Sequence, residues 1–275
     1  MTTDAWDPAQ YNRFADEREQ PFWDLTALLQ PVTNPVLADL GCGDGRLTAA
    51  LHAHLAAGTS HGVDSSAAMI NDARAFGLAE LRLGAGRGAR AMIGFTLGTG
   101  VGGVIAIDGH IYQGRDGTGG EMGHQTLDPE GPTCGCGNRG CLEAYARADR
   151  IAEACGTKSV EEAIERARAG DPRARAGLER VGRYLGVGIA NMITTITPQR
   201  VVLGGGVAAS ADLLLDTIRD EVRRHVFTTS LEGVEIVTAE LGTWAGAIGA
   251  AIHGAEGAEA AGAGARQGRT PAVPA

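Results

Sequence analysis

The sequence predicts an α/β fold, because apolar strand patterns alternate with helical patterns along most of the chain. Several strand patterns end in glycine turns, such as the triple glycine that follows Arg200–Leu203. The chain has 275 residues, enough for two compact lobes, and its 44% hydrophobic content is ordinary for a soluble protein.

The first predicted elements form a strand, a turn, a helix and a second strand. Val36–Leu40 is an apolar run that leads into a glycine turn with Gly41 and Gly43, and residues 46–56 follow as a helix. The second strand ends at Asp64. A glycine turn lets a ligand approach the backbone, and an acidic residue at the end of the next strand can bind a ribose diol.

The middle of the chain predicts a helix, a hairpin and two further helices. Helical spacing covers residues 72–83. Ala91–Leu97 and Val104–Ile107 read as strands around a glycine turn, and Asp108-Gly109 is typical of a tight hairpin. Helical patterns return over residues 142–154 and 159–169.

A long helix should follow Asp171, which is a good N-cap before a proline in the first helical turn. The pattern continues to Ile196, and Pro198 stops it. The remaining expected elements are a strand at Arg200–Leu203, a helix over residues 208–226, a strand over 234–239 and a helix over 246–252.

One histidine and three cysteines lie close together in a glycine-rich stretch of the sequence. They are His124, Cys134, Cys136 and Cys141. Soft thiolates and an imidazole suit a tetrahedral zinc ion, and glycine turns let a short loop bring all four to one point. A disulfide pair or unrelated buried cysteines is the alternative. Three cysteines cannot all pair, so we expect a closed, structural zinc site.

Composition limits the classes of partner and the compartment. The net charge of −9 argues against nucleic acid as a partner. The sequence has no apolar run long enough to span a membrane and no signal peptide at its start. Five cysteines, three of them in the metal-like cluster, fit a reducing cytoplasm.

The cysteine cluster also carries a family resemblance. Gly-Glu-x-Gly-His ending at His124, the Cys-x-Cys-Gly at Cys134 and the Gly-Cys-Leu-Glu ending at Glu143 resemble the ROK family of repressors, open reading frames and sugar kinases, and within it the bacterial glucokinases. The resemblance covers residues 70–253. Further matching segments are residues 71–72, 84–88, 97–103, 182–191 and 201–206.

The resemblance implies a ribonuclease-H-like, actin-like kinase lobe and assigns residues to a sugar site. Asp72 stands where the family has its catalytic base, although as an acidic residue before a helix it could instead be an N-cap. The implied sugar contacts are Asn71, Glu121, His124 and Glu143. His124 would also bind the zinc, which would fix its ring. Glu143 could instead favour a helix start through the helix dipole.

Two glycine-rich segments are candidates for ATP binding. Gly98, Thr99, Gly100, Gly102 and Gly103 could cradle phosphates with backbone N–H groups, or form a hairpin with nothing bound. Gly204, Gly205 and Gly206 could let adenosine lie against the backbone, or make a simple strand-to-helix turn. Magnesium would accompany ATP.

Residues 1–68 resemble a different family. Asp39 and the turn with Gly41 and Gly43, together with Asp64, are similar to the first, Rossmann-like βαβ part of class I S-adenosylmethionine-dependent methyltransferases, most like the trans-aconitate type. This resemblance implies a chimera in which residues 1–68 bind S-adenosylmethionine and 69–254 form a ROK lobe without its opening Asp-x-Gly-Gly-Thr phosphate loop. Residues 255–275, rich in alanine and glycine, should be a disordered tail.

The leading functional hypothesis is an ATP-dependent hexose kinase of the glucokinase type, with activity impaired by the missing phosphate loop. It would be cytoplasmic, bind neither nucleic acid nor membrane, and form the homodimer that the resemblance implies. One alternative is a methyltransferase, and another is a zinc-containing module that binds sugar without catalysis.

Overall fold

The structure, a computed structural model, describes residues 36–40, 51, 55, 59–63, 68–115, 117–207 and 211–253. The chain divides into two units, residues 1–65 and 66–275. In the first unit, β1 (Val36–Leu40) pairs in parallel with β2 (Thr59–Val63). Leu55 N–H donates to the Leu51 carbonyl at 2.9 Å, which fits the predicted helix. Gly41, Gly43 and Asp64 lie outside the described residues.

The second unit is built on a mixed sheet with the strand order β5-β4-β3-β6-β7. The sheet runs antiparallel from β5 to β3 and parallel from β3 to β7. Its strands are β3 (Ala91–Leu97), β4 (Val101–Ile107), β5 (His110–Ile111), β6 (Arg200–Gly204) and β7 (Glu235–Thr238).

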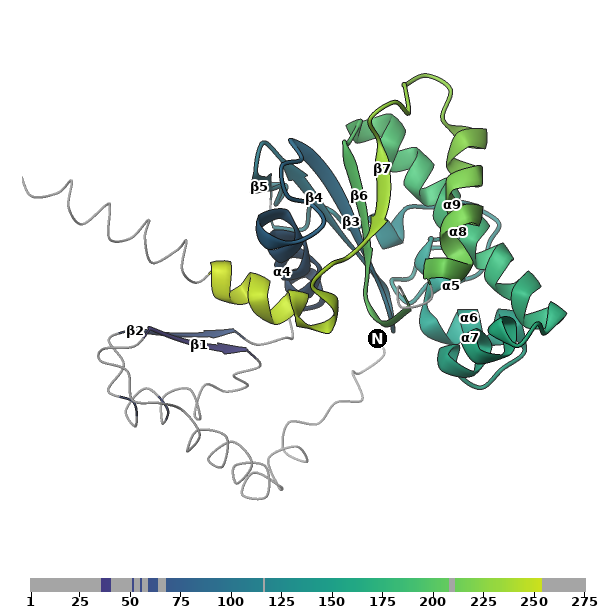
Figure 1. Cartoon of the computed structure of the whole chain (residues 1–275), viewed down its shortest axis with the longest axis horizontal. Helices are drawn as coiled ribbons and strands as arrows, with labels where there is room; N and C mark the ends of the chain where they lie inside the picture. Colours follow the sequence, from purple (N-terminus) through teal and green to yellow (C-terminus); the bar gives the residue numbers. More distant parts are fainter. Residues whose placement is uncertain are drawn as a thin grey trace, which may run out of the picture. The chain divides into compact units, whose positions relative to one another are not determined.

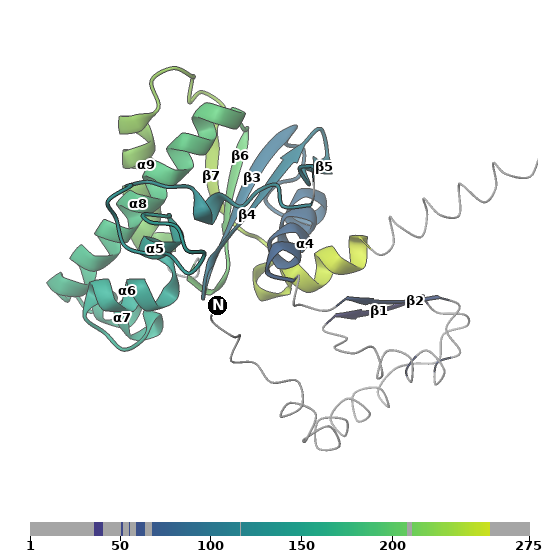
Figure 2. The ribbon, with the colours of Figure 1, turned by 180° about the vertical axis from the view of Figure 1, so that it is seen from behind.

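Helices cover both faces of this sheet, with α8 and α9 on one side and α4 on the other (Figures 1 and 2). The helices are α4 (Ala68–Leu83), α5 (Glu143–Ala146), α6 (Ala148–Cys155), α7 (Val160–Arg168), α8 (Pro172–Ile196) and α9 (Ala211–His225). Short 3-10 turns form η2 (Met122–His124) and η4 (Gly242–Trp244), and a last helix covers residues 245–253.

Strand β3 supplies side chains to the core on both faces of the sheet. Ile93, Phe95 and Leu97 are buried in the larger cluster with residues of α8 and α9. Met92 is buried in the smaller cluster, which contains Phe76 of α4. This period of two is what a central strand covered on both faces requires.

Two glycines let α4 lie close to the sheet. A Cβ atom on Gly94 would come within 3.1 Å of the Phe76 ring, and one on Gly204 would come within 2.3 Å of it. The Phe76 ring therefore occupies the space that two side chains would fill. Because packed interiors leave no spare room, these glycines set the height of α4 above β3 and β6.

Three predicted boundaries were wrong. Helix α4 begins at Ala68, so Asp72 lies inside the helix and is not its N-cap. Strand β4 begins at Val101, which places Gly102 and Gly103 in the ladder opposite Thr96 and Phe95. The helix expected over residues 142–154 breaks at Arg147.

The break at Arg147 has a direct cause in the turn between β3 and β4. Arg147 has an extended backbone (φ −74°, ψ 158°) and separates α5 from α6. The next N–H, that of Ala148, donates to the Gly98 carbonyl at 2.8 Å. A tertiary hydrogen bond thus replaces a helical one.

Other local predictions were confirmed. Asp171 caps α8, as expected, through a side-chain oxygen that accepts from backbone N–H groups. Asp108 (φ 51°) and Gly109 (φ 80°) form the two-residue hairpin turn between β4 and β5. The strands at β6 and β7 and the last helix agree with expectation to within a residue or so. Strand β5 was implied only by the predicted hairpin, and η2 was not anticipated.

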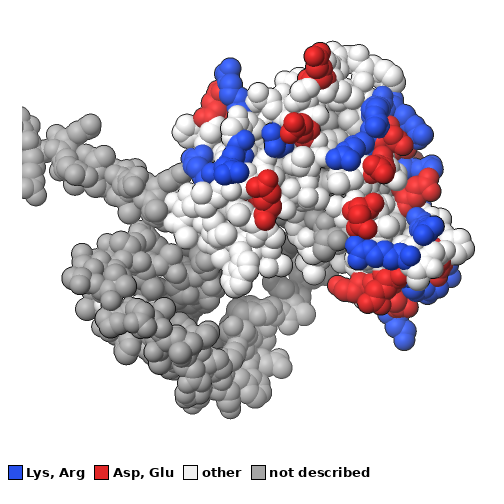
Figure 3. All heavy atoms as spheres, viewed as in Figure 1, with Lys and Arg blue, Asp and Glu red and all other residues white. Residues whose placement is uncertain are grey.

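Acidic and basic side chains lie side by side on the face shown in Figure 3. Ion pairs such as Arg150–Glu153 and Arg183–Glu179 fit this mixture. Exposed pairs of this kind contribute little to stability. On this face, the described residues do not form the single-sign basic surface that attracts nucleic acid.

One carboxylate is fully buried and joins α4 to the chain after β7. Glu80 is 0% exposed. Its oxygens accept from the N–H groups of Ala85 at 2.8 Å, Glu240 at 3.1 Å and Leu241 at 2.9 Å. A carboxylate is tolerated here because backbone donors replace its water.

We expect Glu80→Leu to lower the free energy of unfolding by about 2–4 kcal/mol, because each buried N–H left without an acceptor costs about 1–3 kcal/mol. Urea unfolding measures the change. The same substitution at Glu165, which is exposed on α7, is the control. A loss no larger than that of Glu165→Leu would contradict the structural role given to Glu80.

Candidate functional site

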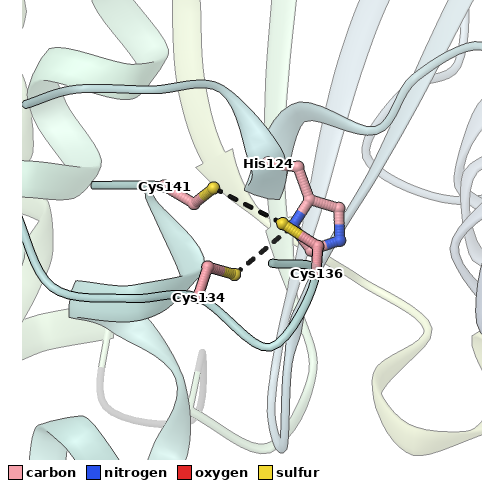
Figure 4. Close-up of side chains that lie close together, drawn as sticks. All are labelled: His124, Cys134, Cys136 and Cys141. Carbon is pink, nitrogen blue, oxygen red and sulfur yellow. Dashed lines mark hydrogen bonds between the residues drawn. The ribbon is translucent and has the colours of Figure 1, made fainter. Parts of the chain in front are cut away.

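The four predicted metal ligands meet at one point (Figure 4). Their ligating atoms all lie within 4.8 Å of one another. His124 Nδ1 is 3.7 Å from Cys134 Sγ, and Cys136 Sγ is 3.7 Å from Cys141 Sγ. The cluster could therefore hold a metal ion, as the sequence predicts.

Tight turns bring the cysteines together. Cys134 N–H donates to the Asn138 carbonyl at 2.8 Å, and Gly137 N–H donates back to Cys134 at 3.0 Å. Gly140 has φ +64°, and a Cβ there would lie 1.6 Å from the Asp128 carbonyl oxygen. Only glycine fits this backbone, which returns Cys141 to the base of the loop.

The three thiols differ in environment. Burial raises the pKa of Cys134, and it raises the pKa of Cys141 to about 12. Cys136 is exposed, and a hydrogen bond from the Asn138 backbone lowers its pKa. Without a metal, the two buried thiols thus hold their protons, whereas a bound cation would favour their thiolates.

The two candidate ATP segments lie at the same edge of the sheet. The turn Gly98–Gly100 follows β3, and Gly204–Gly206 ends the neighbouring parallel strand β6, with Thr96 opposite Gly204. Gly205 has φ +87°, and its Cβ would lie 2.4 Å from the Leu97 carbonyl oxygen. The carboxyl ends of adjacent parallel strands are a common place for ligands in α/β proteins.

The start of α4 lies beside this edge. A Cβ on Gly102 would be 3.0 Å from the Ala73 methyl group, so the residue after Asp72 packs on β4. Arg74 donates to the carbonyls of Gly117 and Gly119, close to Glu121. The backbones of Asn71 and Asp72 are helical, and their side chains lie outside the described residues.

The remaining predicted sugar contacts are half-buried. They lie at the ends of the loop from His124 to Cys141, called the metal loop here because it carries the four candidate metal ligands. Glu121 precedes η2, His124 ends it, and Glu143 begins α5. Glu143 Oε2 accepts from Val101 N–H at 3.0 Å, and Oε1 lies 3.5 Å from Cys134 Sγ. The carboxylate therefore touches both the metal cluster and the turn between β3 and β4.

Sequence reasoning did not find the link from Glu143 to Val101 or the loop contacts of Arg74. The Glu143–Val101 bond joins residues far apart in the chain and involves a backbone donor, so it has no sequence signal. Arg74 offered a weak one, because it stands where the resembling family often has asparagine.

Comparisons with known proteins agree on a family. The sequence matches the ROK family over residues 47–255. It is 37% identical over 199 residues to a glucokinase of Halalkalibacterium halodurans, covering 65% of this chain and 60% of that protein. It is 35% identical over 183 residues to the xylose repressor of Bacillus spizizenii, covering 65% and 48%. The chain thus spans about 60% of the glucokinase's length.

A solved structure gives the same result. The crystal structure of a ROK family glucokinase from Streptomyces griseus in complex with glucose and AMPPNP superposes with a TM-score of 0.63 at 30% identity. The match covers 74% of this chain and 70% of that one.

The comparisons correct the boundary between the two resemblances. The family match begins at residue 47, inside the segment that resembles a methyltransferase, and gives no support to a fused methyltransferase part. A glycine turn followed by an acidic strand end occurs in many α/β folds, so that local pattern was weak. Within the described residues, no helix combines the length and apolar character needed to cross a membrane.

In metal-free, reduced protein, we expect iodoacetamide to modify Cys136 well before Cys134 and Cys141, because the thiolate is the nucleophile. Peptide mass spectrometry at increasing times measures the order, with buried Cys155 as an internal reference. Because burial disfavours the Cys141 thiolate and raises its pKa to about 12, the metal-free fold should keep its stability below pH 9.0, the ordinary thiol pKa, and lose it as pH rises toward about 12. Equal modification rates at all thiols would contradict the assigned environments.

Proposed function

The chain belongs to the ROK family, and on this premise we propose that it is a glucokinase-like sugar kinase that phosphorylates a hexose with ATP. The observation that carries the proposal is the convergence at one edge of the sheet. The start of α4, the turn after β3, the end of β6 and the metal loop all meet there.

Asp72 is the proposed base. A carboxylate at this position accepts the proton of the sugar hydroxyl as the phosphoryl group arrives. Support comes from the position of Asp72 inside α4, next to Ala73, which packs on Gly102. Asp72 is not the N-cap of α4, because the helix begins a full turn earlier, at Ala68.

Polar side chains around the metal loop hold the sugar in this proposal. Glu121 and Glu143 accept hydrogen bonds from hydroxyl groups, and Asn71 and His124 add donor groups. Holding the hydroxyl in line with the phosphate is most of what a kinase contributes to the reaction. The glycine turns at Gly98–Gly100 and Gly204–Gly206 receive the nucleotide in this proposal, and magnesium supplies positive charge to its phosphates.

The metal in this proposal is zinc. Zinc binds sulfur at about 2.3 Å and nitrogen at about 2.0–2.1 Å, so two ligand atoms of a tetrahedral site lie about 3.5–3.8 Å apart. Two of the ligand pairs, each at 3.7 Å, already have this spacing. Three thiolates and one imidazole are also the soft donor set that zinc prefers.

A sugar-binding module without catalysis is the second candidate, since phosphoryl transfer needs more than a sugar site. S-adenosylmethionine has no role in the proposal, because the family match gives no support to a methyltransferase part and the relatives reported above are a glucokinase and a repressor. The homodimer and the cytoplasmic location stay predictions.

Purified protein should contain one zinc ion per chain by elemental analysis. Cys136→Ser should lose the zinc and lower Tm by at least about 5 °C, because a structural zinc contributes directly to folding and each kcal/mol shifts Tm by about 2–4 °C. Cys155→Ala is the control, since it removes a cysteine outside the cluster and should keep the zinc. Wild-type protein that purifies with no zinc would refute the assignment.

Asp72→Ala should lower kcat for glucose phosphorylation by roughly 100-fold or more, because a general base contributes about 10²–10⁴-fold. Glucose binding, measured by calorimetry, should persist. A coupled assay with glucose and magnesium–ATP compares the wild type with Asp72→Ala, Asp72→Asn and Asp216→Ala. Asp216 is an exposed aspartate of α9, and its variant should keep wild-type activity.

The same experiment separates the candidates. Activity that persists in Asp72→Ala would show that the base is wrongly assigned. Glucose binding by the wild type without any turnover would favour the non-catalytic module.

A further inference from the structure

The turn between β3 and β4 has little to hold it in shape by itself. Gly98 N–H donates to the Gly100 carbonyl at 3.0 Å, Thr99 is exposed, and a Cβ on Gly98 would meet nothing within 4 Å. Glycine loses more conformational freedom on folding than any other residue. The order of this turn therefore depends on contacts from other segments.

Both ends of the metal loop supply those contacts. From the end that carries His124, Gly123 packs so closely on Val101 that a Cβ would lie 1.9 Å from the Val101 carbonyl oxygen. From the other end, Glu143 accepts from Val101 N–H, and Ala148 N–H donates to Gly98. The turn thus contacts the segment of His124 on one side and the segment that follows Cys141 on the other.

Glu143 connects the turn to the four candidate metal ligands. One oxygen accepts from Val101 N–H at 3.0 Å, and the other lies 3.5 Å from Cys134 Sγ. Each carboxylate oxygen has two lone pairs, so these contacts leave capacity for a sugar hydroxyl. A charged acceptor also makes a stronger bond to a backbone N–H than a neutral one.

We propose that Glu143 is a positioning residue that holds the Gly98–Val101 turn in the shape that receives nucleotide phosphates, and that closure of the four-ligand loop keeps Glu143 in place. The nucleotide part of this inference rests on the proposed kinase function. Glu143 then serves the nucleotide side of the reaction as well as the sugar side.

Hydrogen–deuterium exchange tests the positioning without any assay of activity. In Glu143→Ala, the Val101 amide should exchange at least about tenfold faster, the loss expected for a bond worth about 1.4 kcal/mol. Glu143→Gln retains an oxygen acceptor, although a neutral acceptor makes a weaker bond, and should restore most of the protection. Glu153→Ala, which removes an exposed carboxylate from α6, is the matched control. Strand β6, residues 200–204, is the internal reference for an intact fold.

The test of the metal loop uses Cys136→Ser, which changes a predicted ligand outside the Gly98–Val101 turn. Exchange over residues 98–101 should rise while β6 stays protected. Since this variant could unfold more widely, the decisive comparison is Glu143→Ala against Glu143→Gln, both of which keep all four ligands. Unchanged exchange at Val101 in Glu143→Ala overturns the proposal.

Nucleotide affinity separates this inference from the proposed function. The Kd or KM for magnesium–ATP should rise about tenfold in Glu143→Ala and be rescued in Glu143→Gln, as the same change in turn stability implies. Faster exchange with unchanged affinity would overturn the nucleotide role of Glu143. A wild-type protein that binds no magnesium–ATP would contradict the kinase function, while the exchange rates would still decide whether Glu143 holds the turn.

Discussion

The candidate site depends on one constraint, which is that the loop from His124 to Cys141 must close without a hydrophobic core of its own. Met122 and Leu142, at the two ends of the loop, belong to the main core. Between them, Leu127 packs partly buried against the main core, and the loop's own buried apolar cluster is limited to Cys134 and Cys141 with the adjoining Ala144. So little buried surface cannot offset the entropy of ordering such a loop. A metal bound by all four ligands would supply the missing energy.

Much of the fold could be predicted from the sequence because its signals are local. The cap Asp171 and the Asp108-Gly109 turn are signals that lie within a few residues of the elements they predict. The errors arose where a distant group decides the outcome. Arg147 leaves the helix because Gly98 accepts from Ala148, and β5 is too short to carry any periodicity of its own.

In the candidate site, too, the local features could be predicted and the contacts between distant residues could not. The four candidate metal ligands lie in one stretch of sequence, so their meeting was predictable. The link from Glu143 to Val101 was not, because one partner is a backbone amide that every residue possesses. The glycine turn and acidic strand end near residues 39–64 show the opposite risk. They form a local pattern that many α/β proteins share, and the ROK match runs into that part of the chain.

The packing of Phe76 has a consequence for how this protein can change. Phe76 and Asp72 are four residues apart on α4, about one helical turn or 6 Å along the axis. A methyl group added at Gly94 or Gly204 would push against the Phe76 ring and tilt the helix. Because Asp72 lies on the same helix, a tilt of α4 would also move the proposed base. Positions without any reactive group could thus tune the rate by setting where a carboxylate stands.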